Sequence, residues 1–243
     1  MAIRISVRDL HAGYGAVQVL HGMSIEVREG ETVALLGTNG NGKSTLMKCL
    51  IGDVRPARGQ LTLEIDGRVL DLSQLTTEQI VDQGISIVPE GRRLFPQLTV
   101  EENLILGAYR KAARGKIETN IEYCYDAFPI LKERRRQLAG SMSGGQQQML
   151  ALARALMSSP RILLVDEPSV GLAPIMVTQA IPKIGELKQR LGLTVLMAEQ
   201  NFQEAMRIAD RGYVLVHGTV AFAADDAAEL RNSELIKQLY LGA

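Results

Sequence analysis

A glycine-rich loop constrains this chain more than any other feature of its sequence. The loop matches the pattern G-x-x-x-x-G-K-[ST]. It follows the apolar run 32–36, which is typical of a buried strand, and precedes the helical segment 46–50. Its backbone N–H groups can point at phosphate oxygens, and the helix N-terminus adds partial positive charge, so the loop predicts a nucleoside triphosphate site in an α/β fold. The residues expected to surround the phosphates are Gly37, Thr38, Asn39, Gly40, Asn41, Gly42, Lys43, Ser44 and Thr45.

Two side chains of this loop have specific expected roles. Lys43 is expected to reach the β- and γ-phosphates. Ser44 is expected to offer its hydroxyl to Mg²⁺, which prefers hard oxygen ligands. A phosphate-loop lysine is also expected to lack a partner in the core, so removing Lys43 should leave the stability of the nucleotide-free protein near wild type.

A carboxylate pair, Asp166 and Glu167, ends the apolar run 162–165. Ligands of open α/β sheets bind at the carboxyl ends of the strands, so this pair can lie beside the phosphate loop. Asp166 is then expected to bind Mg²⁺ through water, and Glu167 is the candidate general base. The pair alone fits a helix N-cap before Pro168 equally well, and the phosphate loop favours catalysis.

A second candidate anion site lies at Ser143, Gly144, Gly145 and Gln146, which open a helix expected to reach residue 158. Three interpretations fit these residues. The site could bind a different anion, act only as a capping box of Ser143 with Gln146, or complete a nucleotide held by a second chain. The third interpretation requires a two-fold dimer with two shared nucleotides.

The apolar patterns indicate where strands and helices lie. Alternating patterns predict half-buried strands at 3–7, 23–27 and 61–65, and continuous apolar runs predict parallel strands at 32–36, 85–88, 162–165, 194–197 and 213–216. A capping box at Thr99 to Glu102 opens a helical lobe, with a break at Phe128 and Pro129. The tail 225–243 is expected to form one or two short helices, with Ser233 as a candidate N-cap.

Composition excludes several classes of protein. Among 243 residues, 27 Lys and Arg balance 27 Asp and Glu, which removes the overall positive charge of a non-specific nucleic-acid binder. Cys49 and Cys124 are too few for a disulfide framework or a zinc site and favour a reducing compartment. The basic cluster 132–136 is interpreted as a solvated helix end, and no apolar run is long enough to cross a bilayer.

The phosphate loop, the Ser143–Gln146 segment, the Asp166–Glu167 pair and their order resemble the ATP-binding subunit of ABC transporters, over essentially the whole chain. The resemblance implies a RecA-like P-loop core with an N-terminal antiparallel β subdomain over 1–94 and 159–243, and an inserted α-helical subdomain over 95–158. It implies ATP and Mg²⁺ as cofactors, with Tyr14 stacked on the adenine; a core tyrosine in a turn is the alternative for Tyr14. It also implies that Ser143–Gln146, the signature segment, faces the γ-phosphate bound by a partner ATPase subunit.

Departures from the common family pattern narrow the subfamily. Met142 stands where the family usually has a leucine, and Ala173 stands where it has an aspartate. Glu90 stands in the place of a glutamine that contacts the metal, and Gln200 stands in the place of the family's switch histidine. Together they resemble the LivF-type ATP-binding subunits of high-affinity branched-chain amino-acid uptake systems. The resemblance makes Glu90 a candidate metal contact. Gln200, with a neutral amide in place of an imidazolium, becomes a candidate catalytic residue that positions the phosphate and the attacking water. The alternative is a polar loop residue or a helix cap ahead of Asn201.

The resemblance implies a peripheral ATPase at the cytoplasmic face of the inner membrane. Its expected partners are two transmembrane permease subunits, a second ATPase chain that is a paralogue or a copy, and indirectly a solute-binding protein, but no nucleic acid. The loop 90–98 is expected to meet a membrane subunit through exposed Leu94, Phe95 and Pro96. A related urea or amide importer is the alternative. A soluble ABC ATPase acting on DNA or ribosomes fits less well, because the chain has one cassette and no room for long coiled coils, and a kinase leaves the signature segment unexplained.

Overall fold

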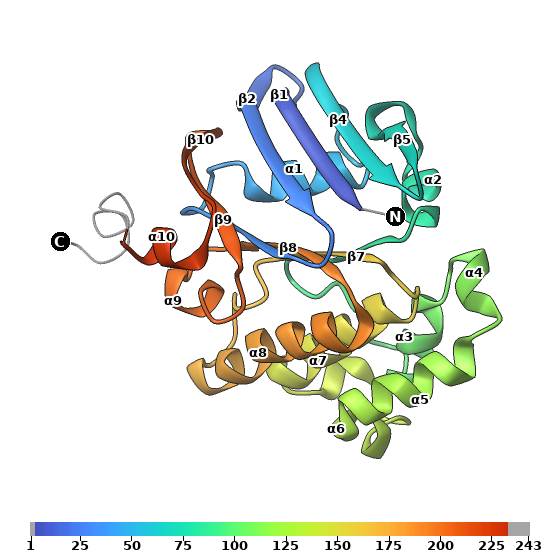
Figure 1. Ribbon diagram of the computed structural model, residues 1–243. Coiled ribbons are helices and arrows are strands. Elements are labelled where there is room, and N and C mark those ends of the chain that lie inside the picture. Colours follow the sequence, from blue (N-terminus) through green and yellow to red (C-terminus); the bar gives the residue numbers. More distant parts are fainter. Residues whose placement is uncertain (1–2, 233–243) are drawn as a thin grey trace.

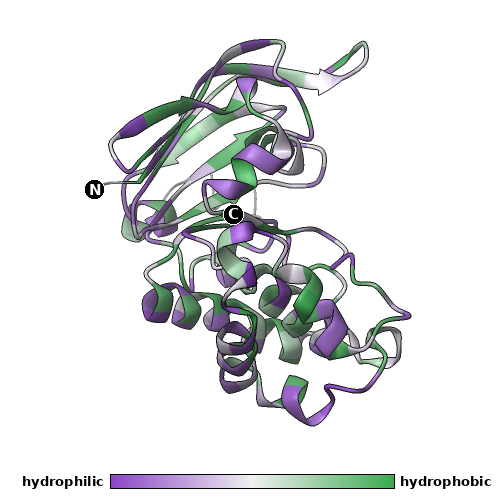
Figure 2. Ribbon diagram, turned by 90° about the vertical axis from the view of Figure 1, so that its right-hand side faces the viewer, coloured by the Kyte–Doolittle hydropathy of each residue, from purple (hydrophilic) through white to green (hydrophobic). Residues whose placement is uncertain are grey.

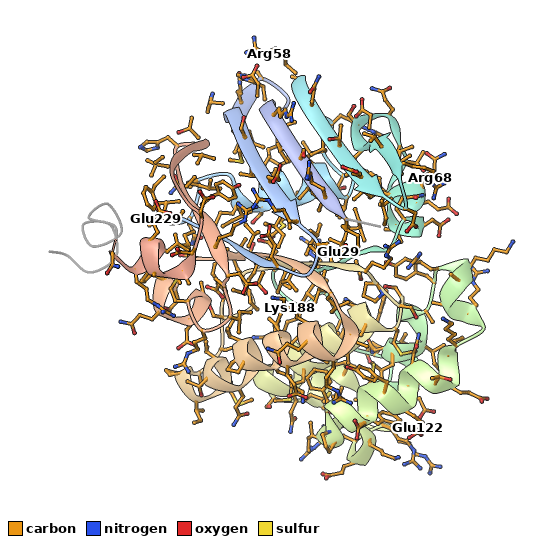
Figure 3. The ribbon with its side chains drawn as sticks, viewed as in Figure 1. Glu29, Arg58, Arg68, Glu122, Lys188 and Glu229 are labelled. Atoms are coloured by element: carbon orange, nitrogen blue, oxygen red, sulfur yellow. The ribbon has the colours of Figure 1, made fainter. Side chains whose placement is uncertain are left out.

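A computed structural model describes residues 3–232 and arranges them around two sheets and a group of helices (Figure 1). Ser233, the expected N-cap, lies outside the described residues. The sheets and the helical part each expose charged side chains, such as the outward-pointing Arg58, Arg68 and Glu122 labelled in Figure 3. No helix among residues 3–232 is both long and apolar enough to span a membrane.

The smaller sheet is antiparallel, with strand order β2-β1-β4-β5. The alternating patterns correctly predicted three of its strands, and the fourth, β5, was missed. β5 follows β4 through a two-residue turn of Asp66 and Gly67, both at positive φ, as a tight hairpin requires. The strands are β1 (Arg4–Tyr14), β2 (Val17–Arg28), β4 (Arg58–Ile65) and β5 (Arg68–Asp71).

The larger sheet has six strands in the order β10-β9-β3-β8-β7-β6. The five continuous apolar runs form its parallel strands, as predicted, and the antiparallel edge strand β10 was missed. A parallel arrangement brings the carboxyl ends of β3, β8 and β7 to one edge of the sheet. The strands are β3 (Thr32–Leu36), β6 (Ile85–Val88), β7 (Ile162–Asp166), β8 (Thr194–Glu199), β9 (Arg211–Val216) and β10 (Thr219–Ala224).

The larger sheet separates two hydrophobic cores. Val33 and Leu35 of β3 point into the core shared with the smaller sheet and α1, whereas Ala34 and Leu36 point into the core shared with the long helices. Figure 2 shows polar residues along the outer surfaces of those helices. The helices are α1 (Lys43–Leu50), α2 (Thr77–Asp82), α3 (Val100–Gly107), α4 (Lys111–Arg114), α5 (Ile117–Ala127), α6 (Pro129–Glu133), α7 (Gly144–Leu156), α8 (Pro174–Leu191), α9 (Phe202–Ala205) and α10 (Ala227–Asn232).

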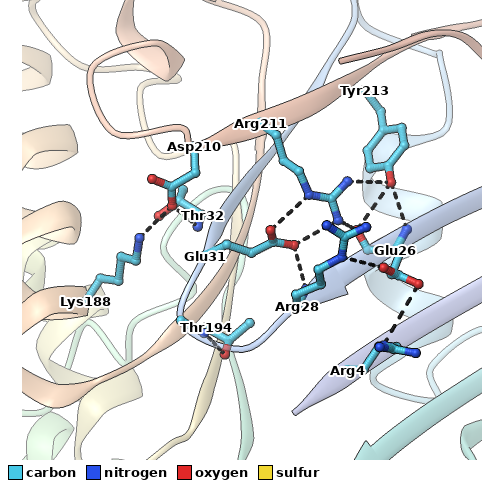
Figure 4. A network of polar contacts seen from close by, with 11 residues as sticks. Arg4, Glu26, Arg28, Glu31, Thr32, Lys188, Thr194, Asp210, Arg211 and Tyr213 are labelled. Carbon is cyan, nitrogen blue, oxygen red and sulfur yellow. Dashed lines mark hydrogen bonds and ion pairs between the residues drawn. The ribbon is translucent and has the colours of Figure 1, made fainter. Parts of the chain in front are cut away.

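A polar network joins the two sheets (Figure 4). Arg211 of β9 donates to both carboxylate oxygens of Glu31 at 2.9 and 2.8 Å and to the Tyr213 hydroxyl at 2.9 Å. The backbone N–H of Glu26 in β2 donates to the same hydroxyl at 3.0 Å. Because Arg211 is buried and its charge is paired, the network fixes β2 against β9.

The predicted fold class is confirmed. A parallel α/β core carries an N-terminal antiparallel sheet, and helices α3 to α7 are inserted in the sequence between β6 and β7. The subdomain boundaries near residues 94 and 158 stay a prediction. The capping box of Thr99 with Glu102 is present at α3, and the basic cluster 132–136 is exposed. Cys49 and Cys124 are buried free thiols, and burial raises the pKa of each to about 12.

Candidate functional site

The phosphate loop connects β3 to α1, in the expected order of strand, loop and helix. Gly42 is the N-cap of α1 and has a φ of 91°, a left-handed conformation that favours glycine. A Cβ atom at Gly42 would lie 2.5 Å from a methyl carbon of Leu20. The turn into α1 therefore requires glycine both for its backbone conformation and for space.

Lys43 is buried within its own loop, with 3% of its surface exposed. Its Nζ donates to the carbonyls of Gly37 at 2.7 Å and Thr38 at 3.1 Å. It also forms an ion pair with Oε1 of Glu167 at 3.0 Å. The expectation that Lys43 lacks a core partner is therefore wrong, because β7 brings a buried carboxylate to the loop.

Ser44 lies beside Asp166, and its hydroxyl donates to Oδ1 of Asp166 at 3.1 Å. Burial raises the pKa of Asp166 to about 6, against the lowering effect of this hydrogen bond, and the negative charges of Glu167 and exposed Glu90 add to the rise. Among residues 3–232, Asp166 accepts a hydrogen bond from Ser44 and forms no ion pair, because Lys43 pairs with Glu167. A buried carboxylate next to a hydroxyl fits Mg²⁺, which binds proteins through one or two carboxylates together with substrate phosphates.

Glu167 lies just beyond the end of β7, at a φ of 49° and with 6% of its surface exposed. Its Oε2 accepts a hydrogen bond from Nε2 of Gln200 at 2.8 Å, while its Oε1 pairs with Lys43. No helix begins at Pro168, since the next helix of the described chain is α8 at Pro174, so the N-cap alternative is wrong. The fold thus brings Lys43, Glu167 and Gln200 into one hydrogen-bonded chain.

Glu199 is a site residue that the sequence reasoning missed. It ends β8, is fully buried, and accepts hydrogen bonds from the loops that follow β7 and β8. Burial raises the pKa of Glu199, against the lowering effect of the donors from Ser169, Gln200 and Asn201. A carboxylate at the end of an apolar run, the signal that identified Asp166, could have identified Glu199 as well.

Tyr14 ends β1 and is 46% exposed, so the interpretation as a core tyrosine is wrong. Its hydroxyl lies 3.5 Å from Oγ1 of Thr45, and Nζ of Lys48 lies 5.3 Å from the centroid of its ring. The ring therefore flanks the first turns of α1. Its stacking on an adenine stays a prediction.

The signature segment opens α7 as a complete capping box. The backbone N–H of Gln146 donates to the Ser143 hydroxyl at 3.4 Å, and Ser143 N–H donates to Oε1 of Gln146 at 3.1 Å. Ser143 is exposed, and within residues 3–232 no hydrogen bond or ion pair joins the segment to the phosphate loop. The guanidinium group of Arg92 lies beside Gly144 and donates to Oε1 of Gln147 and to the carbonyl of Gly171.

The loop 90–98 is fixed to α7 by Arg154. The guanidinium group of Arg154 donates to the carbonyls of Arg92 at 3.1 Å and Arg93 at 2.8 Å, and both loop residues have positive φ. Phe95 is 51% exposed, over Arg154, and borders a cavity of about 400 Å³. Phe95 and Pro96 are exposed as expected, but Leu94 packs partly buried against the core of the long helices, so its predicted exposure is wrong.

Comparison with known proteins agrees with this architecture. The family model for ABC transporters matches residues 20–170. The chain is 45% identical to the high-affinity branched-chain amino acid transport ATP-binding protein BraG of Pseudomonas aeruginosa, over 94% of this chain and 95% of the relative. It is 36% identical to the probable branched-chain amino acid transport ATP-binding protein LivF of Archaeoglobus fulgidus, over 96% of each chain.

Solved structures show the same fold. A nucleotide-free ATP-binding cassette from an ABC transporter superposes with a TM-score of 0.82 over 100% of both chains, at 24% identity. An ATP binding subunit of an ABC transporter superposes with a TM-score of 0.78 over 98% of both chains, at 30% identity. Together with the matched sequence motifs, these comparisons identify the chain as a member of the ABC transporter family, an ATP-binding subunit with ATPase activity.

Proposed function

We propose that this chain hydrolyses ATP to drive the uptake of branched-chain amino acids, as a peripheral subunit at the cytoplasmic face of the inner membrane. One observation carries the catalytic part: the Glu167 carboxylate lies 3.0 Å from Lys43 Nζ and 2.8 Å from Gln200 Nε2. A base, a cation and an amide donor at the carboxyl edge of a parallel sheet suit phosphoryl transfer to water. The printed names of BraG and LivF support the class of solute.

Each residue of the site has a step in the proposed reaction. Lys43 exchanges its contact with Glu167 for the β- and γ-phosphates, which frees Glu167 to accept a proton from the attacking water. Gln200 keeps the Glu167 carboxylate and that water in place with a neutral amide. Residues Ser44, Asp166 and Glu90 would hold Mg²⁺, which when bound neutralises phosphate charge.

The signature segment is the proposed contact with a second ATPase chain. Ser143 is exposed, and the contacts of its side chain are those of a helix cap. We infer that it completes the nucleotide site of a partner, either a copy of this chain or a paralogue, in a dimer that encloses two nucleotides. The N–H groups of the first turn of α7 then face the γ-phosphate held by the partner's phosphate loop.

The loop 90–98 is the proposed contact with one of two transmembrane permease subunits, which link the ATPase indirectly to a solute-binding protein. The exposed Phe95 ring supports this assignment, because a large exposed apolar side chain over a cavity suits a protein partner. Arg154 joins the same loop to α7, the helix that the signature segment opens.

Glu167→Gln tests the catalytic part. The amide keeps the size of the side chain but cannot accept the proton, so ATP binding should persist and turnover should fall below ~1% of wild type. The ATP-bound dimer should accumulate and elute earlier from a size-exclusion column than the nucleotide-free chain. Glu118→Gln, an exposed residue of α5, is the matched control and should behave as wild type. Prompt turnover by Glu167→Gln would remove Glu167 from the mechanism.

Uptake by the complete transporter in vesicles tests the solute. Radiolabelled leucine should accumulate in an ATP-dependent manner, and Glu167→Gln in this chain should abolish that accumulation. Accumulation of urea or an amide without leucine would replace the proposed solute and leave the ATPase assignment unchanged.

A further inference from the structure

Glu199 receives four hydrogen bonds while it is completely buried at the carboxyl end of β8. Its Oε1 accepts from Ser169 N–H at 3.0 Å. Its Oε2 accepts from the Ser169 hydroxyl at 2.9 Å, from Gln200 N–H at 2.9 Å and from Asn201 N–H at 3.2 Å. One carboxylate therefore holds the loop after β7 and the loop after β8 together.

These two loops carry the pair at the centre of the proposed reaction. Ser169 follows Glu167 by two residues, and Gln200 adjoins Glu199 itself. Glu167 has a left-handed backbone, which costs free energy for a residue other than glycine and persists only where surrounding contacts hold it. The side chains of Glu167 and Gln200 meet at 2.8 Å, so their spacing depends on how the two loops are fixed to each other.

The chemistry of the four donors requires a carboxylate at position 199. An ionised carboxylate only accepts hydrogen bonds. The three backbone donors are N–H groups, which can donate a hydrogen bond but cannot accept one. A glutamine would place its NH₂ group against at least one of these N–H donors and leave that donor buried without an acceptor. An aliphatic residue would leave all of them unpaired.

We propose that Glu199 is a positioning residue for ATP hydrolysis: it fixes the loop that begins with Glu167 to the loop that begins with Gln200, and so keeps the Gln200 amide against the Glu167 carboxylate. This inference rests on the proposed roles of Glu167 and Gln200. Glu199 itself contacts neither the phosphate loop nor Glu167 through any hydrogen bond described among residues 3–232.

Glu199→Gln should lower kcat by roughly 10- to 100-fold, somewhat less than the loss of a donor that contacts the transition state. The KM for ATP should stay within about twofold, because Lys43 and its loop are untouched. Ser169→Ala, which removes one of the four donors and disturbs packing little, should lower kcat by a few-fold and keeps the test available if Glu199→Gln does not fold. Asp210→Asn is the matched control, since Asp210 accepts from Thr32 N–H at the opposite end of the same sheet and should leave kcat unchanged.

A double-mutant cycle separates positioning from general stabilisation. Because Glu199 acts through Gln200, adding Glu199→Gln to Gln200→Ala should cause no more than about a twofold further loss of kcat. The inference would be overturned if the kcat losses of the two single variants multiplied in the double variant. A wild-type kcat for Glu199→Gln would also overturn it. A wild-type kcat for Gln200→Ala would refute the proposed role of Gln200, and that result comes from a variant in which Glu199 is intact.

Discussion

The carboxyl edge of the six-stranded sheet and the first turn of α7 both present groups suited to phosphate, but the two regions are built differently. At the sheet edge, Lys43, Asp166 and Glu167 are buried, and residues far apart in the sequence hold them. At α7, Ser143 is exposed, and its side-chain partner is Gln146, three residues away. One region is a tertiary assembly of charges, and the other is a local helix cap.

The difference indicates which region the chain completes by itself. At the sheet edge Lys43 and Glu167 pair with each other before nucleotide arrives, and buried Asp166 accepts a hydrogen bond from Ser44, so substitutions there should change both stability and turnover.

Ser143 caps α7 and Gly145 packs against Met176, but Gly144 has only the guanidinium group of Arg92 beside it, so a substitution at Gly144 should change turnover alone. Three predictions test this division and a fourth tests the loop 90–98, from the largest expected effect to the smallest.

Lys43→Ala should lower turnover by roughly 1000-fold or more, because the triphosphate loses its main protein cation. The nucleotide-free chain should also lose about 3 kcal/mol of unfolding free energy, because Glu167 remains buried without its ion pair. Urea denaturation measures the second effect. Adding Glu167→Gln to Lys43→Ala should restore much of the stability but none of the turnover. An unchanged urea midpoint for Lys43→Ala would show that the ion pair does not contribute to stability.

Gly144→Asp should lower turnover by roughly 100-fold, since the added carboxylate repels the γ-phosphate of the partner's nucleotide. The stability and the ATP affinity of the isolated chain should not change, because an aspartate is favourable in the first turn of a helix and Arg92 lies beside the new side chain. Gly115→Asp, at a site with open space, is the matched control. A large loss of stability in Gly144→Asp alone would mean that the signature segment belongs structurally to its own chain.

The raised pKa of Asp166 predicts that stability at the sheet edge depends on pH. Its pKa is about 6 in the folded protein against 3.8 ordinarily, so the folded state binds the proton more tightly. The contribution of Asp166 to the free energy of unfolding is fully present below the pKa that Asp166 has in the unfolded chain. This contribution is lost as the pH rises through about 6, and the loss is at most about 3 kcal/mol. In EDTA and without nucleotide, Asp166→Asn should therefore be more stable than wild type at pH 7 to 8, and the two should converge near pH 4. Parallel stability profiles of the two proteins would contradict the raised pKa.

Phe95→Ala should reduce solute uptake by several-fold and leave ATP affinity and thermal stability near wild type, because the ring is half exposed and contacts a partner subunit in the proposed function. Uptake in vesicles and nucleotide binding by the isolated chain measure the two quantities. An equal loss of both would place Phe95 in the core instead of the interface.

The parts of the site with local sequence signals could be predicted. The phosphate loop, the capping boxes and the Asp166–Glu167 pair each depend on a few neighbouring residues, and the parallel strands on continuous apolar runs. The ion pair of Lys43 with Glu167 and the role of Glu199 depend on the strand order, which places β8 between β3 and β7. No local pattern encodes that order, and the edge strands β5 and β10 were missed because β5 has no fully buried residue and β10 has one, so neither presents a buried face.

The most direct test of the central claim asks whether the signature segment acts on the nucleotide of its own chain or on that of its partner. Two ATPase chains, copies or paralogues with distinguishable tags, are assembled with the permease subunits, and ATP turnover is measured. In the first pair, one chain carries Lys43→Ala and the other carries the signature change Gly144→Asp or its equivalent. In the second pair, one chain carries both changes and the other is wild type.

The proposed shared sites predict opposite results for these two pairs. In the first pair both defects fall on one shared site, so the other site is intact and turnover should persist at about half of wild type. In the second pair each shared site has one defective half, so turnover should be lost. Turnover by the second pair and none by the first would contradict the account, because it would mean that each chain completes its own nucleotide site.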